Sequence, residues 1–409
     1  MLDSNCLVEN PIARMAALCL VPLALLSACN GNSAGSNVQA SLCAARQPGA
    51  SAKQLKACEG ALSAKVDKAM QGIQKKHGVT AATISIMHDG RVLHEQGYGF
   101  LDATQRTPLP ANALFVTASI IKPLTAAAIH KLAAARQLSL DDKVFCTVAG
   151  QSCWLPVPLA PEEAFDPRLK DITISHLLAH QGGWDAELSG DAFVAEALIQ
   201  AELGLNAPAQ QEDITRWMVR RPLDYQPGSQ TVYSNFGYML LGRIIEQASK
   251  TAYVDYVYGQ ILQPLGIPRE DFKPVASRLK DHDPREPNYL TTLQAPSVFE
   301  PGKLVSALDG AVRAENWQST GLVISTAHAM AAFAGSYEAP SGLPLAGKTH
   351  NGGHTGAVPG LTTVMRQLPS GISFAVMLNT RDELHSDGPG SVEYSALYDI
   401  ENALKEAGL

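Results

Sequence analysis

Three short strings occur in a fixed order along this chain, and they constrain its fold because their side chains are useful together only if the fold gathers them. They are Ser119-Ile120-Ile121-Lys122, Tyr233-Ser234-Asn235 and His354-Thr355-Gly356. Together they supply a hydroxyl nucleophile, two candidate bases and a backbone segment that could stabilise an anion. The sequence therefore predicts an enzyme whose site is built from three distant segments.

The first string opens a helix. A serine and a lysine three positions apart on a helix lie on one face, so the amine of Lys122 can reach the hydroxyl of Ser119. An Ala-rich apolar run follows from Leu124 to Leu138, and Pro123 is tolerated only near a helix start. The string Ser277-Arg278-Leu279-Lys280 has the same pattern, but it lies in a charged stretch without an apolar face. We therefore predict Ser119 as the nucleophile, at a helix N-terminus.

Either of two residues could take the proton of Ser119. An unperturbed lysine has a pKa of about 10.4 and an unperturbed tyrosine about 10, so both are mostly protonated at neutral pH. A Lys122 cation beside Tyr233 would lower the pKa of the phenol, while desolvation would lower the pKa of the amine. Both Lys122 and Tyr233 remain candidates for the general base.

The three strings, together with further stretches, give the chain a resemblance to the serine β-lactamase and penicillin-binding-protein superfamily. It is most similar to the branch of class C β-lactamases, D,D-peptidases, D-aminopeptidases and related esterases. The further stretches cover most of the chain and are Asp89-Gly90, Leu138 to Asp142, Ile174 to Gly183, Pro227 to Gly242, and Pro264-Leu265-Gly266. Members often have lysine where His354 stands here.

The same strings give each site residue an expected role. Asn235 is expected to hydrogen-bond Lys122 and the substrate amide or ester. The backbone N–H groups of Ser119 and Ala357 are expected to form the oxyanion hole. We expect His354, Thr355 and Gly356 to lie on the strand that binds the substrate.

Periodicity predicts helices and hairpins at both ends of the chain. Apolar residues fall at helical spacing from Leu62 to Ile73, followed by a hairpin over 81–97. A second hairpin is expected over 361–378, followed by a helix carrying Leu397, Ile400 and Leu404. These elements predict an α+β fold with an antiparallel sheet flanked by terminal helices and an α-rich lobe. The resemblance implies that this fold is of the β-lactamase and transpeptidase type, with the active site between the lobes.

The N-terminus reads as a lipoprotein signal. Arg14 precedes an apolar run from Met15 to Leu26 that is shorter than the roughly 20 residues of a spanning helix. Leu26-Ser27-Ala28-Cys29 resembles a bacterial lipobox, which makes Cys29 the lipidated residue. We therefore expect a signal peptide over 1–28, a flexible tether over 29–60 and a hydrolase domain over 61–409. The protein would be exported and anchored by lipid at the cell envelope, on the periplasmic side and, in a Gram-negative cell, at the outer membrane.

Four cysteines remain after the signal and the lipidated residue are set aside: Cys43, Cys58, Cys146 and Cys153. They allow two disulfides with three connectivities, of which we favour the local pairs Cys43 with Cys58 and Cys146 with Cys153. The spacing does not match a zinc site. His176 and His180 lie four apart without a glutamate between them, which favours structural roles over metal binding.

Composition limits the kinds of molecule that we expect this protein to bind. The chain is 46% hydrophobic and 17% charged with a net charge of -7, as expected for an ordinary globular protein without a basic nucleic-acid-binding patch. We expect a small ester, amide or peptide substrate, a membrane contact only through the lipid, and no cofactor or metal.

These features lead to an exported serine hydrolase that works through an acyl-enzyme on Ser119, with a β-lactam or D-amino-acid peptide among its possible substrates. The alternative is a penicillin-sensor-like protein that is acylated but hardly turns over. His354 near its reference pKa of about 6.5 would be mostly neutral, so we expect uncharged substrates to be preferred and carboxylate-bearing substrates to improve toward pH 6. Arg366 or Arg313 could supply the missing cation.

Overall fold

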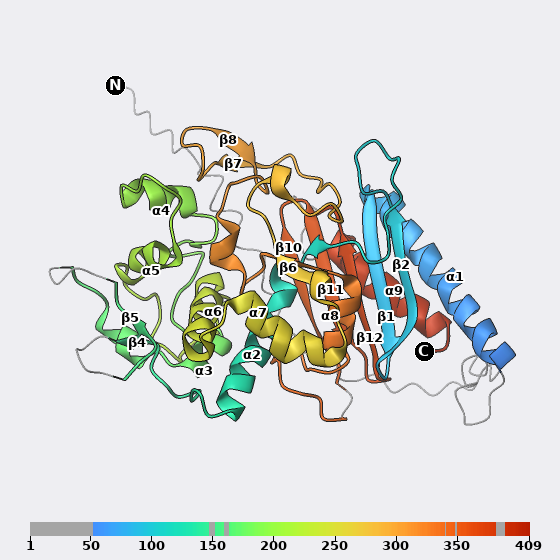
Figure 1. Cartoon of the computed structure of the whole chain (residues 1–409), viewed down its shortest axis with the longest axis horizontal. Coiled ribbons are helices and arrows are strands. Elements are labelled where there is room, and N and C mark those ends of the chain that lie inside the picture. Colours follow the sequence, from blue (N-terminus) through green and yellow to red (C-terminus); the bar gives the residue numbers. More distant parts are fainter. Residues whose placement is uncertain (1–51, 147–151, 159–162, 340, 348–349, 382–388) are drawn as a thin grey trace, which may run out of the picture.

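The computed structural model describes residues 52–146, 152–158, 163–339, 341–347, 350–381 and 389–409 (Figure 1). The expected signal segment, Cys29 and Cys43 lie outside these residues. Among the helices within them, none is both long enough and apolar enough to cross a bilayer.

The described residues contain a five-stranded antiparallel sheet with the strand order β10-β11-β12-β1-β2. Its strands are β1 (Ala81–His88), β2 (Arg91–Gly99), β10 (Gly352–Val358), β11 (Leu361–Gln367) and β12 (Ile372–Leu378). Asp89 and Gly90 both have positive φ, which suits the tight turn of the first hairpin. Both predicted hairpins are confirmed, and β1 pairs with β12 to join them into one sheet.

Two terminal helices cover one face of this sheet and lie side by side (Figure 1). They are α1 (Ala52–His77) and α9 (Val392–Glu406). Side chains that alternate along the strands, such as Ile84 and Phe374, pack against Met70 and Ile400 in a buried cluster. The α+β fold with terminal helices flanking an antiparallel sheet is confirmed.

The first helix begins at Ala52, before the expected domain boundary at residue 61. Residues 52–60, which we expected in the flexible tether, are therefore helical. Residues 52–58 read Ala-Lys-Gln-Leu-Lys-Ala-Cys, and Ala, Lys, Gln and Leu are among the strongest helix formers.

The other face of the sheet carries α8 (Ala327–Ala334), and beyond it lies the α-rich lobe. A small sheet, β3 (Phe115–Val116), β9 (Val323–Ser325) and β6 (Phe272–Pro274), connects the two parts. The lobe contains α2 (Lys122–Ala134), α3 (Ile174–Leu178), α4 (Glu196–Glu202), α5 (Gln211–Val219), α6 (Asn235–Ser249) and α7 (Tyr253–Val257). The expected two-part architecture is therefore present.

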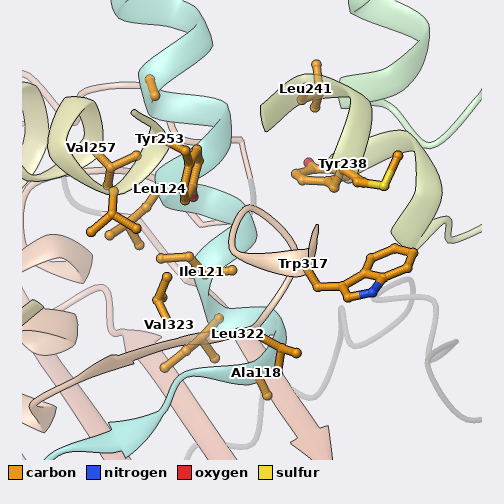
Figure 2. Packing of buried hydrophobic residues seen from close by; sticks show 14 of the residues in the cluster. Ala118, Ile121, Leu124, Tyr238, Leu241, Tyr253, Val257, Trp317, Leu322 and Val323 are labelled. Carbon is orange, nitrogen blue, oxygen red and sulfur yellow. The ribbon is translucent and has the colours of Figure 1, made fainter. Parts of the chain in front are cut away.

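Helix α2 runs through the interior of the lobe. Its residues from Lys122 to Ile129 are all buried, so this part of the helix is enclosed on every side. Figure 2 shows Leu124 beside Tyr253 and Val257, while Ile121 lies near Leu322 and Val323. The start of α2 is therefore held by packing from segments far apart in the sequence.

Shorter elements complete the lobe. The strands are β4 (Phe145–Cys146), β5 (Leu155–Pro156), β7 (Gln294–Pro296) and β8 (Leu304–Ser306). Cys146 and Cys153 form a disulfide with their Cα atoms 5.3 Å apart, in agreement with the local pairing predicted for them. The other predicted pair is not described, because Cys43 and the side chain of Cys58 lie outside the described part.

Candidate active site

The chain makes a strained turn immediately before Ser119. Strand β3 leads through Thr117 to Ala118, whose φ is 47°, and then into a 3₁₀ turn over Ala118–Ile121 that continues into α2. A non-glycine residue in the left-handed region costs on the order of 1 to 2 kcal/mol. The contacts of Thr117 offset this cost, because its N–H donates to Val323 O at 2.8 Å and its side chain is buried. The turn fixes the direction in which Ser119 leaves the backbone.

Both candidate bases contact the hydroxyl of Ser119. The Tyr233 hydroxyl lies 2.6 Å from Ser119 Oγ, and Lys122 Nζ lies 3.1 Å from the same oxygen. Both groups donate to Ser119 Oγ, and either one, once it has lost its own proton, lies where it could receive the proton of Ser119.

Lys122 is 1% exposed, although a buried ammonium is costly without partners. Its Nζ lies 2.9 Å from Asn235 Oδ1 and 2.8 Å from the carbonyl oxygen of Thr320. It also lies 4.7 Å from the centre of the Tyr233 ring, within the range of a cation–π interaction. Three segments of the chain thus hold the amine beside Ser119.

Asn235 is the first residue of α6, and the Ser234 side chain caps this helix by accepting from Gly237 N at 3.1 Å. The cap and the extended chain before it set the positions of Tyr233 and Asn235 on one side of Ser119. The amide nitrogen of Asn235 donates to Asp191 Oδ2 at 2.7 Å. Asn235 thus bridges Lys122 and the partly buried carboxylate of Asp191.

His180 supports the same side of the site. Its ring stacks on those of Tyr233 and Tyr238, with centroid distances of 4.7 Å to each. Its Nδ1 accepts from Ser234 N at 3.1 Å, so this nitrogen carries no proton. Burial, with a smaller contribution from Lys122, lowers the pKa of His180 to about 3. A neutral ring is therefore part of the packing behind Tyr233.

Strand β10 forms the opposite side of the site. A side-chain carbon added at Gly356 would lie 2.7 Å from Ser119 N and 2.6 Å from Thr363 Oγ1, so the strand passes directly against the start of the helix. Thr363 secures this approach, because its hydroxyl lies 2.8 Å from Thr117 O and 3.2 Å from Gly356 O. The backbone at Gly356 is thus close to Ser119 N, the side on which the oxyanion hole is expected.

His354 is half-buried in the same strand, on the side of the sheet shared with Met365. Its Nδ1 donates to Thr355 O at 2.7 Å. Burial, together with the nearby charge of Lys122, lowers the pKa of His354 to about 4. The expectation that His354 gains charge toward pH 6 is wrong, because the ring stays neutral until well below that pH.

Neither proposed replacement cation faces the site. Arg366 lies on the opposite face of the sheet, where its Nε donates to Glu401 in α9 at 2.9 Å. Arg313 is directed to Gln210 and lies 3.5 Å from Glu315. Both charges are used in ion pairs or hydrogen bonds elsewhere.

Several residues of the site carried no sequence signal. Asp191 lies in a loop and belongs to no motif, and Thr320 acts through its backbone carbonyl, which any residue would supply. The strained φ of Ala118 could not be inferred from an alanine. His180 lies in the stretch from Ile174 to Gly183 that contributes to the family resemblance, but its stacking on Tyr233 depends on packing between distant segments.

Metal binding has no geometric support in the described residues, where no group of three or more His, Cys, Asp and Glu side chains is placed to hold an ion. His176 and His180 do not converge. His176 Nδ1 accepts from Thr173 N at 3.3 Å in the cap of α3, whereas His180 faces Tyr233.

An antiparallel sheet with flanking terminal helices, together with a serine held by a lysine and a tyrosine, defines a serine hydrolase of the β-lactamase and transpeptidase class. Comparison with known proteins agrees. The sequence pattern of the Beta-lactamase family matches residues 66–395. The chain belongs to this family.

Individual relatives are distant. Protein flp of Staphylococcus aureus (strain N315) is 28% identical over 218 residues, which is 53% of this chain and 40% of that protein. The chain thus spans less than half the length of that relative. Esterase EstB of Burkholderia gladioli is 27% identical over 272 residues, covering 59% of this chain and 64% of the esterase.

Solved structures share the fold. The octameric penicillin-binding protein homologue from Pyrococcus abyssi superposes with a TM-score of 0.58 at 23% identity, covering 84% of this chain and 77% of its own. EstCE1, a hydrolase with promiscuous acyltransferase activity, gives a TM-score of 0.58 at 19% identity, covering 85% and 99%.

The close approach of β10 to Ser119 gives a testable prediction. Gly356→Ala should lower kcat by about 10² to 10³-fold, the usual effect of losing one oxyanion donor, because the methyl group would push β10 away from Ser119 N. Ester hydrolysis and the thermal unfolding midpoint would be measured together. Gly259→Ala is the matched control, since an added methyl there meets nothing within 4 Å. A rate unchanged in Gly356→Ala would exclude this geometry.

Proposed function

We propose that this protein hydrolyses a small ester or amide through an acyl-enzyme on Ser119. The observation that carries the proposal is the convergence of Tyr233 and Lys122 on Ser119 Oγ, at 2.6 and 3.1 Å. No other arrangement is needed to activate the hydroxyl, and the N–H of Ser119 lies where the carbonyl oxygen of a bound substrate would become negative.

The reaction follows from these positions. Ser119 Oγ gives its proton to Lys122 or Tyr233 and forms a bond to the substrate carbonyl carbon. The negative charge that develops on the carbonyl oxygen is stabilised by the N–H groups of Ser119 and Ala357. The base returns the proton to the leaving oxygen or nitrogen as its bond to carbon breaks, which leaves the ester of Ser119. Water then gives a proton to the base and forms a bond to the carbonyl carbon of this ester. The base returns the proton to Ser119 Oγ as its bond to carbon breaks, which releases the acid.

The electrostatics of β10 favour an uncharged substrate. The ring of His354 is neutral at physiological pH, and Arg366 is paired with Glu401 behind the sheet. A carboxylate beside this strand would therefore lack the fixed charge that lysine supplies in other members of the family. The relative named Esterase EstB supports an ester substrate of this kind.

The sensor alternative differs only in the second half of the reaction. A sensor would show a burst of product equal to the concentration of protein and negligible steady turnover. A hydrolase would continue to release product. Pre-steady-state measurement with a chromogenic ester and a chromogenic cephalosporin separates the two.

Removal of the nucleophile and of each base tests the mechanism. Ser119→Ala should abolish turnover and labelling by a fluorophosphonate probe, because the attacking oxygen is lost with little change in packing. Lys122→Ala and Tyr233→Phe should each lower kcat by about 10² to 10⁴-fold, the range for a positioned acid or base. Ser277→Ala, which removes the other Ser-x-x-Lys serine, should behave as wild type. Labelling that persists in Ser119→Ala would place the nucleophile elsewhere.

Substrate choice depends on the charge at position 354. In His354→Lys, kcat/KM for a penicillin relative to a neutral ester should rise by about tenfold, because a hydrogen bond to a charged group is stronger by roughly 1 to 1.5 kcal/mol. In wild type this ratio should stay flat between pH 8 and 6, since His354 has a pKa of about 4. His354→Gln, which stays neutral, is the control. A wild-type preference for penicillin would refute the proposal.

We further propose that the protein is exported and held at the cell envelope by a lipid on Cys29. Support comes from the sequence alone: a positive charge, a short apolar run and the lipobox-like Leu26-Ser27-Ala28-Cys29. The disulfide between Cys146 and Cys153 fits an oxidising compartment.

Fractionation of cells that express the full chain tests this location. Cys29→Ser should move the protein from the membrane fraction to the soluble exported fraction, because the lipid provides the attachment. Cys6→Ser, a change within the expected signal, should leave the distribution unaltered. Continued membrane association of Cys29→Ser would identify an anchor other than the lipid.

A further inference from the structure

Asp191 lies beside the hydrolytic site without contacting the nucleophile. Its Oδ1 accepts from Phe193 N at 3.0 Å, and its Oδ2 accepts from Asn235 Nδ2 at 2.7 Å. Each carboxylate oxygen therefore faces a donor, an arrangement that suits the ionised form, which only accepts. Burial raises the pKa of Asp191, while these donors and the charge of Lys122 oppose the shift.

The contact decides which way the Asn235 amide points. An amide presents an oxygen on one side and an NH₂ group on the other, so fixing one side fixes both. Because Asp191 requires a donor, Nδ2 turns toward it and Oδ1 turns toward Lys122 Nζ, 2.9 Å away. The reverse orientation would place NH₂ against the amine and oxygen against the carboxylate.

We propose that Asp191 is a positioning residue, whose carboxylate fixes the Asn235 amide and through it holds Lys122 against Ser119. The inference rests on the proposed use of Ser119 and Lys122. The Asn235 side chain lies between the Asp191 carboxylate and the buried amine of Lys122. Asp191 therefore also supplies a negative countercharge, which stabilises a buried cation.

The loop that carries Asp191 is fastened to the segment that supplies the other partner of Lys122. Glu196 accepts from Asn316 Nδ2 at 3.0 Å and from Arg313 N at 2.8 Å. Phe193 packs edge-on against Trp317, with ring centroids 5.2 Å apart. Thr320 follows three residues after Trp317, and its N–H donates to Trp317 O at 3.0 Å. The two segments that support Lys122, one carrying Asp191 and the other Thr320, are therefore held together.

The charge of Asp191 should be visible in the pH dependence. The titratable groups that face Lys122 from neighbouring elements are Tyr233, Tyr238, His180 and His354. Burial, with a smaller contribution from Lys122, lowers the pKa values of His180 and His354 to about 3 and about 4, so both rings are neutral near neutral pH. Removing a nearby negative charge lowers the pKa of any acid beside it, so the effect has the same sign whether Lys122 or Tyr233 is the base.

The test uses Asp191→Asn in the full-length chain, with the rate of fluorophosphonate labelling of Ser119 as the readout. The asparagine keeps the shape but has one acceptor for two donors. We expect labelling to slow by about 10²-fold, as a misplaced group does, and its acidic limb to move about one pH unit lower. Asp191→Glu, which keeps the charge, should leave the limb near its wild-type position.

Asp185→Asn is the matched control on the same loop, because Asp185 accepts from Tyr225 and Glu187 N rather than from the site. It should change neither the rate nor the limb. A constant unfolded fraction would scale the rate without moving the limb, and unfolding in acid would move the limb to higher pH, opposite to the shift expected for Asp191→Asn. A slower rate with an unmoved limb would overturn the proposal.

A double-mutant cycle adds a second criterion. In an Asn235→Ala background, Asp191→Asn should cause little further loss, since Asp191 acts through Asn235. If the loss of rate in the double mutant equalled the product of the two single losses, the inference would also be overturned. Wild-type protein that is not labelled at Ser119 at all would contradict the proposed function instead, which keeps the two failures distinct.

Discussion

The burial of one amine sets the requirements for the centre of this molecule. Lys122 is 1% exposed, and transferring an unpaired ammonium from water into such a place is strongly unfavourable. The buried ammonium is stabilised because oxygens of Ser119, Asn235 and Thr320 lie within 3.1 Å of Lys122 Nζ. These three residues come from three separate segments, so the site is complete only when the lobe is folded.

The strained entrance to α2 follows the same logic. Ala118 adopts a left-handed φ that costs free energy locally, and buried contacts through Thr117 and Thr363 compensate for it. The left-handed conformation of Ala118 directs the Ser119 side chain toward Tyr233 and places the N–H of Ser119 close to β10. Stability elsewhere in the fold is thus used to hold the reacting groups in a geometry that the isolated segment would avoid.

The sequence predicted those parts of the molecule that depend on local pattern. The helix through Leu62 and Ile73 and both hairpins followed from residue spacing and turn residues, and the three strings did converge. The missing parts depend on tertiary contact: Asp191 reaches the site through a loop, and Thr320 contributes a carbonyl. The neutral state of His354 at pH 7 agrees with the prediction, but the expected gain of charge toward pH 6 does not, because a reference pKa takes no account of burial or of Lys122.

The pairing of β1 with β12 has a consequence for how the chain reaches its fold. The N-terminal hairpin has its main partner near the opposite end of the sequence, and α1 packs on α9. During synthesis, the sheet that contains β1 and β2 therefore cannot close until β12 has emerged. Such distant contacts make folding slow, because a long loop has to be ordered before the contacts stabilise it. A chain released without its last helix would leave the apolar face of the sheet uncovered and prone to aggregate.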